Sequence, residues 1–158
     1  MGYYFVPIFI GPDHHRVDLI MDTGSALTTF PCSGCNFSCG HHFNKPFQKD
    51  ASKSYSPINC SNEYYGWKCG SCFSGRSASC HYVLNYVEGS GYEGDYGEDY
   101  VVFQDEIANF DKETNEEEKK KYKSLFGCTS RESGMLKDQD ADGILGLGIL
   151  TNCKWFFC

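Results

Sequence analysis

The stretch VDLIMDTGSALTTFP, residues 17–31, places an Asp-Thr-Gly-Ser tetrad directly after a run of large apolar residues. Such a run is typical of a β-strand, which would end at Asp22. Upstream, residues 3–10 (YYFVPIFI) form a second β-rich run, and the Gly-Pro-Asp-His-His segment at 11–15 separates the two runs as a hairpin turn would. On the tetrad alone, a turn residue capped by Thr and Ser hydroxyls is the better explanation of Asp22.

Length and composition favour a single all-β unit. The chain has 158 residues, enough for one domain or for one lobe of a larger protein. Aromatic residues make up 16% of the sequence and there are 17 glycines, a combination that predicts many short strands joined by turns. The formal net charge is −7 and the sequence has no obvious basic patch, so we expect no nucleic-acid partner.

Cysteines are unusually dense in one region of the chain. Seven of the ten lie between residues 32 and 80, which indicates either disulfides or a metal site. Two glycosylation sequons, at Asn36 and Asn59, fall in the same region and would be surface acceptors in a secreted chain. We therefore expect an oxidising compartment: the secretory pathway, with a vacuolar, lysosomal or extracellular destination and a membrane tether conceivable in the full-length protein.

The start of the chain shows no secretory leader, because the segment after Met1 lacks a basic beginning and is too short for an apolar core and cleavage site. No apolar stretch approaches the length of a membrane span. A secretory-type chain without its leader predicts a fragment of a longer protein.

A zinc-stabilised cysteine module is the rival explanation of the cysteines. CSGC at 32–35 and CGSC at 69–72 form two C-x2-C motifs, and His41 and His42 lie nearby. The two motifs are further apart than the usual separation of about 15 to 20 residues, and the remaining cysteines would be unexplained. Disulfides are therefore favoured and no metal site is predicted, but the pairing is left open. The histidines at 14, 15, 41 and 42 are expected to be solvated, as loop residues usually are.

The remaining segments predict a hairpin, a charged surface element and a glycine-rich strand. Residues 82–103 (YVLNYVEGSGYEGDYGEDYVVF) are typical of a long hairpin whose tip lies near residues 88–91. Residues 111–123 place Glu ahead of Lys, as in one or two solvated helical turns. DQDADG at 138–143 imitates half of a calcium loop, but Ile149 stands where the bidentate Glu should be, so calcium is not expected.

The order of three elements resembles the amino-terminal lobe of pepsin-like aspartic peptidases. They are the strand with DTGS, the Tyr-bearing glycine-rich hairpin and ADGILGLG at 141–148. The cysteine-rich region after FPC and the YVEGS segment narrow the resemblance to the cysteine-rich eukaryotic branch, which includes nepenthesin-like and plasmepsin V-like enzymes. The resemblance predicts a lobe at 1–148 with a disulfide-rich insert at about 32–80 and a flap hairpin at about 82–103. The atypical tail at 149–158 departs from the family and is interpreted as a truncation.

The resemblance implies an aspartic-type endopeptidase that uses an activated water and no cofactor. Asp22 would be one of two catalytic aspartates that share a proton, because one carboxyl must accept the proton of water while the other polarises the carbonyl. The loop around it would be supported by Thr23, Gly24 and Ser25, with Ser25 in a hydrogen bond to Asp22. The substrate-binding flap would use Tyr86, Glu88 and Gly89. Residues 143–146 would pack behind the aspartate loop.

Two departures from the family pattern limit what this chain can do. Thr29 stands where pepsin has a tryptophan that binds the flap tyrosine, and no second D-[TS]-G motif occurs. We therefore expect the peptide substrate to need a partner, a carboxy-terminal lobe that carries the second aspartate, and this chain alone to be inactive. The alternatives are a homodimer that brings two copies of Asp22 together, a non-catalytic peptide-binding or interaction domain, and the zinc-stabilised module.

Overall fold

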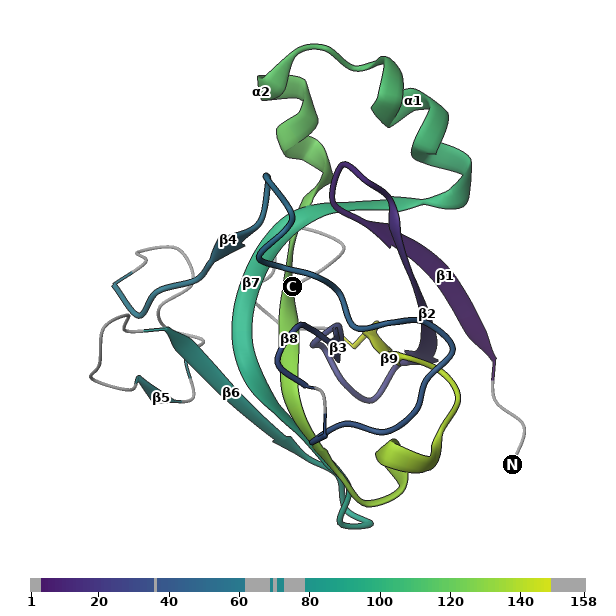
Figure 1. Ribbon diagram of the computed structural model, residues 1–158, viewed down its shortest axis with the longest axis vertical. Coiled ribbons are helices and arrows are strands. Elements are labelled where there is room, and N and C mark those ends of the chain that lie inside the picture. Colours follow the sequence, from purple (N-terminus) through teal and green to yellow (C-terminus); the bar gives the residue numbers. More distant parts are fainter. Residues whose placement is uncertain (1–3, 36, 62–68, 70, 73–78, 149–158) are drawn as a thin grey trace.

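Strands dominate the fold. The computed structural model describes residues 4–35, 37–61, 69, 71–72 and 79–148. Within this part of the chain nine strands form one sheet, in the order β1-β2-β9-β3-β8-β7-β6-β5, with β4 paired to β7 (Figure 1). The strands are β1 (Phe5–Ile10), β2 (His15–Asp22), β3 (Thr29–Pro31), β4 (Ser56–Pro57), β5 (Ser71–Cys72), β6 (Cys80–Asn85), β7 (Gly91–Phe103), β8 (Lys123–Ser133) and β9 (Gly143–Gly146). The all-β prediction is confirmed.

The sheet curls back on itself around an aromatic and aliphatic core. β1 pairs with β2 along its whole length and also with the end of β7, where Ile8 lies opposite Phe103. Alternate residues of β1, Ile8 and Ile10, face the core and are at most 1% exposed. Phe30 from β3 packs on Phe126 from β8 with 4.8 Å between ring centroids. Each such fully buried side chain contributes about 1.5–3 kcal/mol to folding.

β9 passes between the two strands that flank the tetrad. It runs parallel to β2, with Gly146 opposite Asp22, and meets β3 at Thr29. A Cβ atom on Gly146 would lie 2.6 Å from the backbone nitrogen of Leu27, so only glycine allows this close packing. The prediction that residues 143–146 pack behind the aspartate loop is therefore confirmed.

The predicted flap hairpin is formed by β6 and β7. Asn85 and Gly91 are the last paired residues before the turn. The other side of β7 pairs with β8 from Gly91 to Tyr100, so the hairpin is anchored along its length. Figure 1 shows its turn at the opposite end of the molecule from the helices.

Two short helices interrupt the sheet between β7 and β8. They are α1 (Ile107–Lys112) and α2 (Glu116–Lys119), and single turns of 3-10 helix, Gln104–Glu106 and Lys120–Tyr122, flank them. The predicted surface element at 111–123 contains α2. The first helix lies largely ahead of this range. It is anchored to the lobe by Phe110, which is buried between the rings of Tyr100 and Tyr122, at centroid distances of 5.1 and 5.3 Å. No helix in the described residues is long and apolar enough to cross a membrane.

Four disulfides tie the described residues together. They are Cys32–Cys128, Cys35–Cys39, Cys60–Cys72 and Cys69–Cys80. The prediction of a disulfide-rich insert is confirmed, and the first bond extends it into β8, which the sequence did not indicate. The tail at 149–158 and the sequon residue Asn36 lie outside the described residues, whereas Asn59 is exposed.

One of the histidine predictions is wrong. The side chain of His42 is only 4% exposed, because it lies between Glu132 and the backbone of Gln139, which both offer it hydrogen-bond acceptors. His41 is exposed as expected. The histidines of the β1–β2 hairpin are half-buried: His14 bonds to Asp111 at 2.9 Å, and His15 donates to a backbone carbonyl.

Candidate active site

Asp22 lies on a short loop that the backbone holds in place. The residue ends β2 and is half-buried, and its Oδ1 accepts a hydrogen bond of 2.8 Å from the backbone N–H of Gly24. From below, the N–H groups of Leu147 and Gly148 donate to the carbonyls of Asp22 and Ser25, both at 2.7 Å. No salt bridge among the described residues involves Asp22. The carboxyl is thus fixed in position without a cation that would neutralise it.

Two buried hydroxyls accompany this carboxyl. Ser25 Oγ and Tyr86 Oη are shielded from solvent, and neither has a partner with good hydrogen-bond geometry in the described part of the chain, although the two lie close enough together for the Ser25 hydroxyl to lower the pKa of Tyr86. The predicted hydrogen bond between Ser25 and Asp22 is therefore not formed. An unsatisfied buried hydroxyl costs about 1–3 kcal/mol, so two of them at one site need an explanation beyond packing.

Tyr86 brings the flap hairpin over the aspartate loop. It follows β6 directly, its N–H donates to the carbonyl of Ser90 at 2.8 Å, and its ring meets Tyr92 edge-on with centroids 6.4 Å apart. Burial raises the pKa of the Tyr86 hydroxyl; the nearby Ser25 hydroxyl lowers it by acting as a hydrogen-bond donor, and the charges of Asp22 and Glu88 raise it. The structure thus brings Tyr86, Ser25 and Asp22 together from two distant parts of the sequence.

The tip of the flap is open to solvent. Val87, Glu88 and Gly89 are all exposed, and the apolar side chain of Val87 is fully so. Gly89 has φ of +96°, a conformation that favours glycine and closes the turn. Thr23, the second residue of the tetrad, is also exposed. These residues are free to contact another molecule.

Thr29 has a different role from the tryptophan that it replaces. Its Oγ1 hydrogen-bonds with Tyr82 Oη at 2.5 Å, with Thr129 Oγ1 at 2.7 Å and with the carbonyl of Gly127 at 3.0 Å. This buried group joins β3 to β6 and β8 and leaves the hydroxyl of Tyr86 without the partner that pepsin provides. Burial raises the pKa of the Tyr82 hydroxyl, which therefore stays neutral.

A pair of aspartates other than Asp22 is buried behind the loop, and no local pattern in the sequence indicates it. Asp18 and Asp142 are each 3% exposed, and the side-chain amide of Asn44 donates to both carboxylates, at 2.8 and 2.7 Å. Asp142 also accepts from two backbone N–H groups, and Arg16 pairs with Asp18 at 2.9 Å. The oxygens of Asp142 that a calcium loop would use are therefore engaged in hydrogen bonds.

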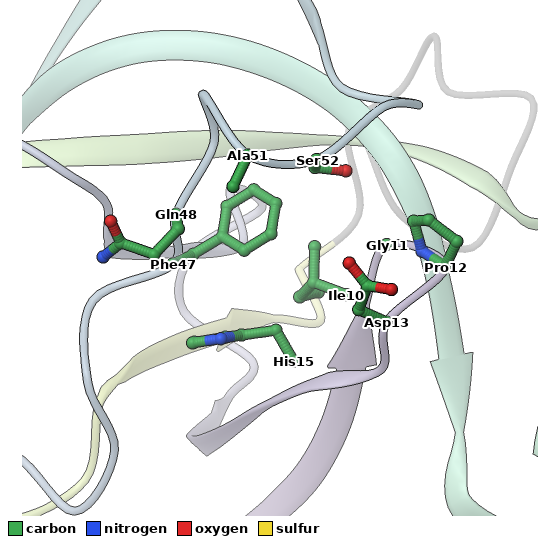
Figure 2. A pocket seen from close by; sticks show the side chains of 9 residues that line it. All are labelled: Ile10, Gly11, Pro12, Asp13, His15, Phe47, Gln48, Ala51 and Ser52. Atoms are coloured by element: carbon green, nitrogen blue, oxygen red, sulfur yellow. The ribbon is translucent and has the colours of Figure 1, made fainter.

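A small pocket lies at the other end of β2. It is bounded by the β1–β2 turn and residues 47–52, with Ile10, His15 and Phe47 among its walls, and its volume is about 90 Å³ (Figure 2). β2 separates it from Asp22 by seven residues, roughly 23 Å at 3.3 Å per residue. Binding sites for drug-sized ligands occupy about 300–1,000 Å³, so this pocket is not a peptide site.

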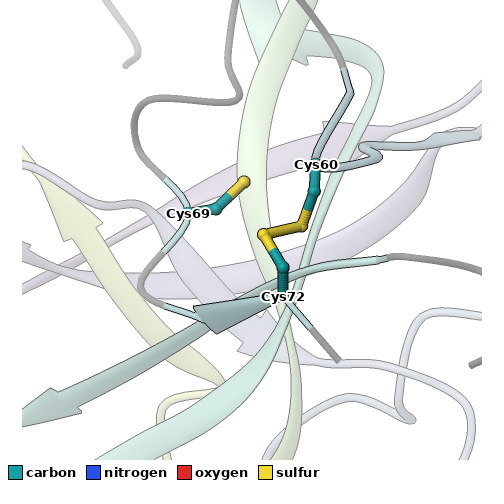
Figure 3. Close-up of side chains that lie close together, drawn as sticks. All are labelled: Cys60, Cys69 and Cys72. Carbon is teal, nitrogen blue, oxygen red and sulfur yellow. A yellow bond between two sulfur atoms is a disulfide. The ribbon is translucent and has the colours of Figure 1, made fainter. Parts of the chain in front are cut away.

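The sulfur atoms of Cys60, Cys69 and Cys72 lie within 4.8 Å of one another, which is the kind of cluster that can hold a metal (Figure 3). Two adjacent disulfides, Cys60–Cys72 and Cys69–Cys80, account for this proximity. All eight cysteines of the described residues are bonded to another cysteine. The cysteines that would provide thiolate ligands for zinc are therefore bonded in disulfides in this form of the protein.

The fold and the aspartate loop together define the amino-terminal lobe of an aspartic peptidase. A family model described as "Xylanase inhibitor N-terminal" matches residues 4–151, nearly the whole chain. The chain belongs to this family, an aspartic-protease amino-terminal domain.

Individual relatives agree with this assignment. Plasmepsin V of Plasmodium falciparum is 36% identical over 150 residues, which cover 94% of this chain and 23% of the relative. Aspartic protease 5 of Toxoplasma gondii is 30% identical over 92% of this chain and 15% of its own length. Aspartyl protease AED1 of Arabidopsis thaliana is 28% identical over 93% of this chain and 28% of its own length. The chain therefore spans less than a third of each of these relatives.

Proposed function

We propose that this chain is the amino-terminal lobe of an aspartic endopeptidase and carries half of its active site, in which Asp22 provides one of the two catalytic carboxyls. The observation that supports this most directly is the position of Asp22, on a loop held by the residues that follow β9 and close to the buried hydroxyls of Ser25 and Tyr86. A structural turn aspartate would not need a tyrosine hairpin above it.

The reaction needs a second carboxyl from outside this chain. One aspartate must be ionised to take a proton from water while its neighbour is protonated and polarises the scissile carbonyl, so activity should be greatest when the pair holds one proton. Around Asp22 the apolar side chains of Met21 and Leu147 are 50% and 41% exposed. We propose that a carboxy-terminal lobe covers this rim and contributes the second aspartate.

The substrate in this proposal is an extended peptide held between the loop and the flap. Tyr86 would orient it, and Glu88 and Gly89 at the tip would meet its backbone. Thr23 would contact the matching loop of the other lobe. Gly24 would keep the Asp22 carboxylate in place through its N–H group.

Site-directed variants of the full-length protein that contains this chain test the proposal. Asp22→Asn should reduce kcat for a peptide substrate at acidic pH by about 10³-fold or more. Asp13→Asn changes an exposed aspartate in the β1–β2 turn and should leave kcat unchanged. Equal activity of Asp22→Asn and the unaltered protein would rule out the proposed mechanism.

The isolated chain provides a second test. It should show no pepstatin-sensitive peptide cleavage, and sedimentation should report a monomer. Cleavage by a monomer would contradict the need for a second lobe, whereas cleavage by a dimer would support the pairing of two copies of Asp22.

A binding function without catalysis is the second candidate, because the description of the matching family names an inhibitor. A protein of this kind would bind peptide or protein ligands through the flap and the loop. Ligand affinity would then survive Asp22→Ala, and no cleavage would accompany it. Isothermal titration with the variant, together with a cleavage assay of the unaltered full-length protein, separates the two functions.

We also propose that the protein works in the secretory route, in a vacuolar, lysosomal or extracellular setting. The four disulfides and the exposed sequon at Asn59 support this location. Thiol alkylation of the protein as isolated from its source tests it, since free thiols at these cysteines would contradict an oxidising compartment.

A further inference from the structure

A buried ion pair lies under the flap, separate from the aspartate loop. The side chains of His42 and Glu132 are 4% and 0% exposed, and His42 Nε2 is 3.0 Å from Glu132 Oε2. The same oxygen accepts a hydrogen bond from the backbone N–H of Gly40 at 3.0 Å. Burying two ionisable groups is costly unless their hydrogen bonds are complete, and Glu132 Oε1 has no partner among the described residues, so the pair requires a reason.

The hydrogen bonds of His42 fix how many protons the pair holds. Its Nδ1 is 3.0 Å from the carbonyl of Gln139, which can only accept, so Nδ1 carries a hydrogen. Its Nε2 faces a carboxyl oxygen of Glu132, so a second hydrogen must lie between these two atoms, on either one. Without that proton a nitrogen lone pair would face a carboxylate at hydrogen-bond distance. The geometry therefore belongs to the protonated pair.

A continuous series of contacts leads from this pair to the flap. Glu132 in β8 lies directly opposite Tyr92 in β7. The hydroxyl of Tyr92 accepts a hydrogen bond of 3.0 Å from the side chain of Gln139, the residue whose carbonyl accepts from His42. The ring of Tyr92 in turn supports the ring of Tyr86. His42 and Glu132 thus complete a ring of interactions beneath the flap tyrosine.

The backbone around the pair has little freedom to adapt. A Cβ atom on Gly40 would lie 1.9 Å from the carbonyl oxygen of Lys137, so the two segments are in direct contact. The N–H of Glu132 donates to the carbonyl of Ser38, and the N–H of Phe43 donates to the carbonyl of Asp140. A lost hydrogen bond between His42 and Glu132 cannot be replaced by a small shift of the loop.

The charged groups around His42 favour its protonated form. Burial by itself lowers the pKa of His42, but the hydrogen bond and charge of Glu132, the carbonyl of Gln139 and the charge of Asp142 outweigh it, so the pKa stands above 6.5. From β7, the hydroxyl of Tyr92 is kept neutral because burial and Glu132 raise its pKa. The neighbouring ionisable side chains on these segments, those of His41, Arg131, Lys137, Asp138 and Asp140, belong to exposed residues.

We propose that His42 and Glu132 are positioning residues for the flap: the protonated pair holds Tyr92 and Gln139 in place beneath Tyr86, and loss of its proton loosens the flap. This rests on the proposed function, in which Tyr86 closes over a peptide. It makes the closed flap a property of acidic solution, in which the proposed aspartate pair would also hold its shared proton.

The sign of the pH effect follows from linkage. A group whose pKa is raised by folding contributes stability that is complete below its unfolded value, here 6.5, and is lost as the pH rises through the folded value. The flap should therefore be well held at pH 5.5 and progressively looser above pH 6.5.

Hydrogen exchange of the flap in the full-length protein tests this directly. The N–H groups of Tyr86 and Gly89 are hydrogen-bonded within the turn, and mass spectrometry of the flap peptide reports how often these bonds open. After correction for intrinsic exchange, protection should fall about tenfold between pH 5.5 and 8.5, as expected for loss of a charge-assisted hydrogen bond. In His42→Gln the profile should be flat, with low protection throughout. His41→Gln changes an exposed neighbour and should match the unaltered protein.

Each result decides one question. A pH-independent flap in the unaltered protein overturns the proposal, as does a His42→Gln profile that matches that of His41→Gln. If His42→Gln does not fold, the pH profiles of the unaltered protein and of Glu132→Gln decide instead, and Glu132→Gln must be flat. Hydrogen exchange is measured without catalysis, so a result that overturns the flap proposal leaves the proposed peptidase function untouched. Conversely, cleavage independent of Asp22 contradicts the proposed function and leaves the flap linkage intact.

Where cleavage is observed, kinetics provide a further readout. Because flap positioning acts mainly on substrate binding, His42→Gln should raise KM several-fold at pH 5.5 and change kcat less. A loss confined to kcat would contradict a positioning role.

Discussion

Removing the disulfide between Cys32 and Cys128 should destabilise the lobe more than removing any local bridge. This bond joins residues 96 positions apart and connects β3 to β8 through the centre of the fold. Both cysteines are within the main hydrophobic cluster, at 1% and 2% exposure. The perturbation is the double variant Cys32→Ala with Cys128→Ala, and the control is Cys35→Ala with Cys39→Ala, whose bridge spans 4 positions.

The expected magnitude follows from the length of chain that each bridge closes. The loss of loop-closure entropy predicts about 4.7 kcal/mol for the long loop and about 2 kcal/mol for the short one. Replacement of each buried sulfur by a methyl hydrogen adds roughly 1 kcal/mol of lost packing in the core. The core pair loses one more buried sulfur than the control pair, in which Cys35 is buried and Cys39 is half-buried. The two double variants should therefore differ by about 3–4 kcal/mol in the free energy of unfolding.

Urea denaturation monitored by tryptophan and tyrosine fluorescence measures this difference. With a slope of about 1–3 kcal/mol per molar urea, the two midpoints should be separated by about 1–4 M. A control variant as destabilised as the Cys32/Cys128 variant would refute the loop-length argument. A long-range variant that loses less than about 2 kcal/mol would show that the core, rather than the bridge, sets the stability.

Three further substitutions test individual contacts. Asp99→Asn should lower the free energy of unfolding by about 2–4 kcal/mol, because the fully buried carboxylate accepts hydrogen bonds from two serine hydroxyls and one backbone amide; thermal melts check this, and a change below 0.5 kcal/mol would contradict it. Burial and nearby aspartates raise the pKa of Tyr55 to about 12, so its contribution to stability is complete below pH 10 and is lost as the pH rises through 12. In that window Tyr55→Phe should lose less free energy of unfolding than the unaltered protein. Coincident unfolding curves would refute the assignment. Ser25→Ala removes a buried hydroxyl without a partner and should leave the lobe as stable or about 1 kcal/mol more stable, whereas a clear loss in calorimetry would reveal a hydrogen bond in solution.

Local sequence signals were sufficient for the elements that carry the proposed chemistry. The apolar run before Asp22 predicts β2 because strand composition and the flanking turn are properties of contiguous residues. The same holds for the flap, where glycines near residue 90 mark a turn between two strands. The prediction that residues 143–146 pack behind the loop came from the order of the motifs and the resemblance that it carries, because no local pattern reveals a strand that passes between two others.

Contacts between residues that are far apart in the sequence could not be predicted from such local signals. His42 reads as a loop histidine, because nothing near it in the sequence indicates Glu132, which lies 90 positions away. Asp18 reads as the polar member of a strand, although Asn44 and Asp142 surround it in the fold. A buried charge is made tolerable by partners that folding brings together, so its burial cannot be read from its neighbours in the chain.

The site combines an aspartate loop held by backbone hydrogen bonds with an exposed hairpin turn, and the two parts are held by different contacts. The backbone of Asp22 is held by its pairing with Gly146 of β9 and by the N–H of Leu147, which no side-chain titration can release. The flap tip, in contrast, has exposed side chains, and its turn is tied to the lobe by Ser90, whose hydroxyl accepts from the N–H of Met135 at 3.1 Å. A bound peptide would cover Val87 and offer partners to the buried hydroxyl of Tyr86, so closure would be driven by contacts that the empty site lacks. Substrate, rather than the fold alone, would then complete the active geometry. The protonated His42–Glu132 pair would hold the flap near its closed position beforehand, and so reduce the free energy that substrate binding must spend on ordering the flap.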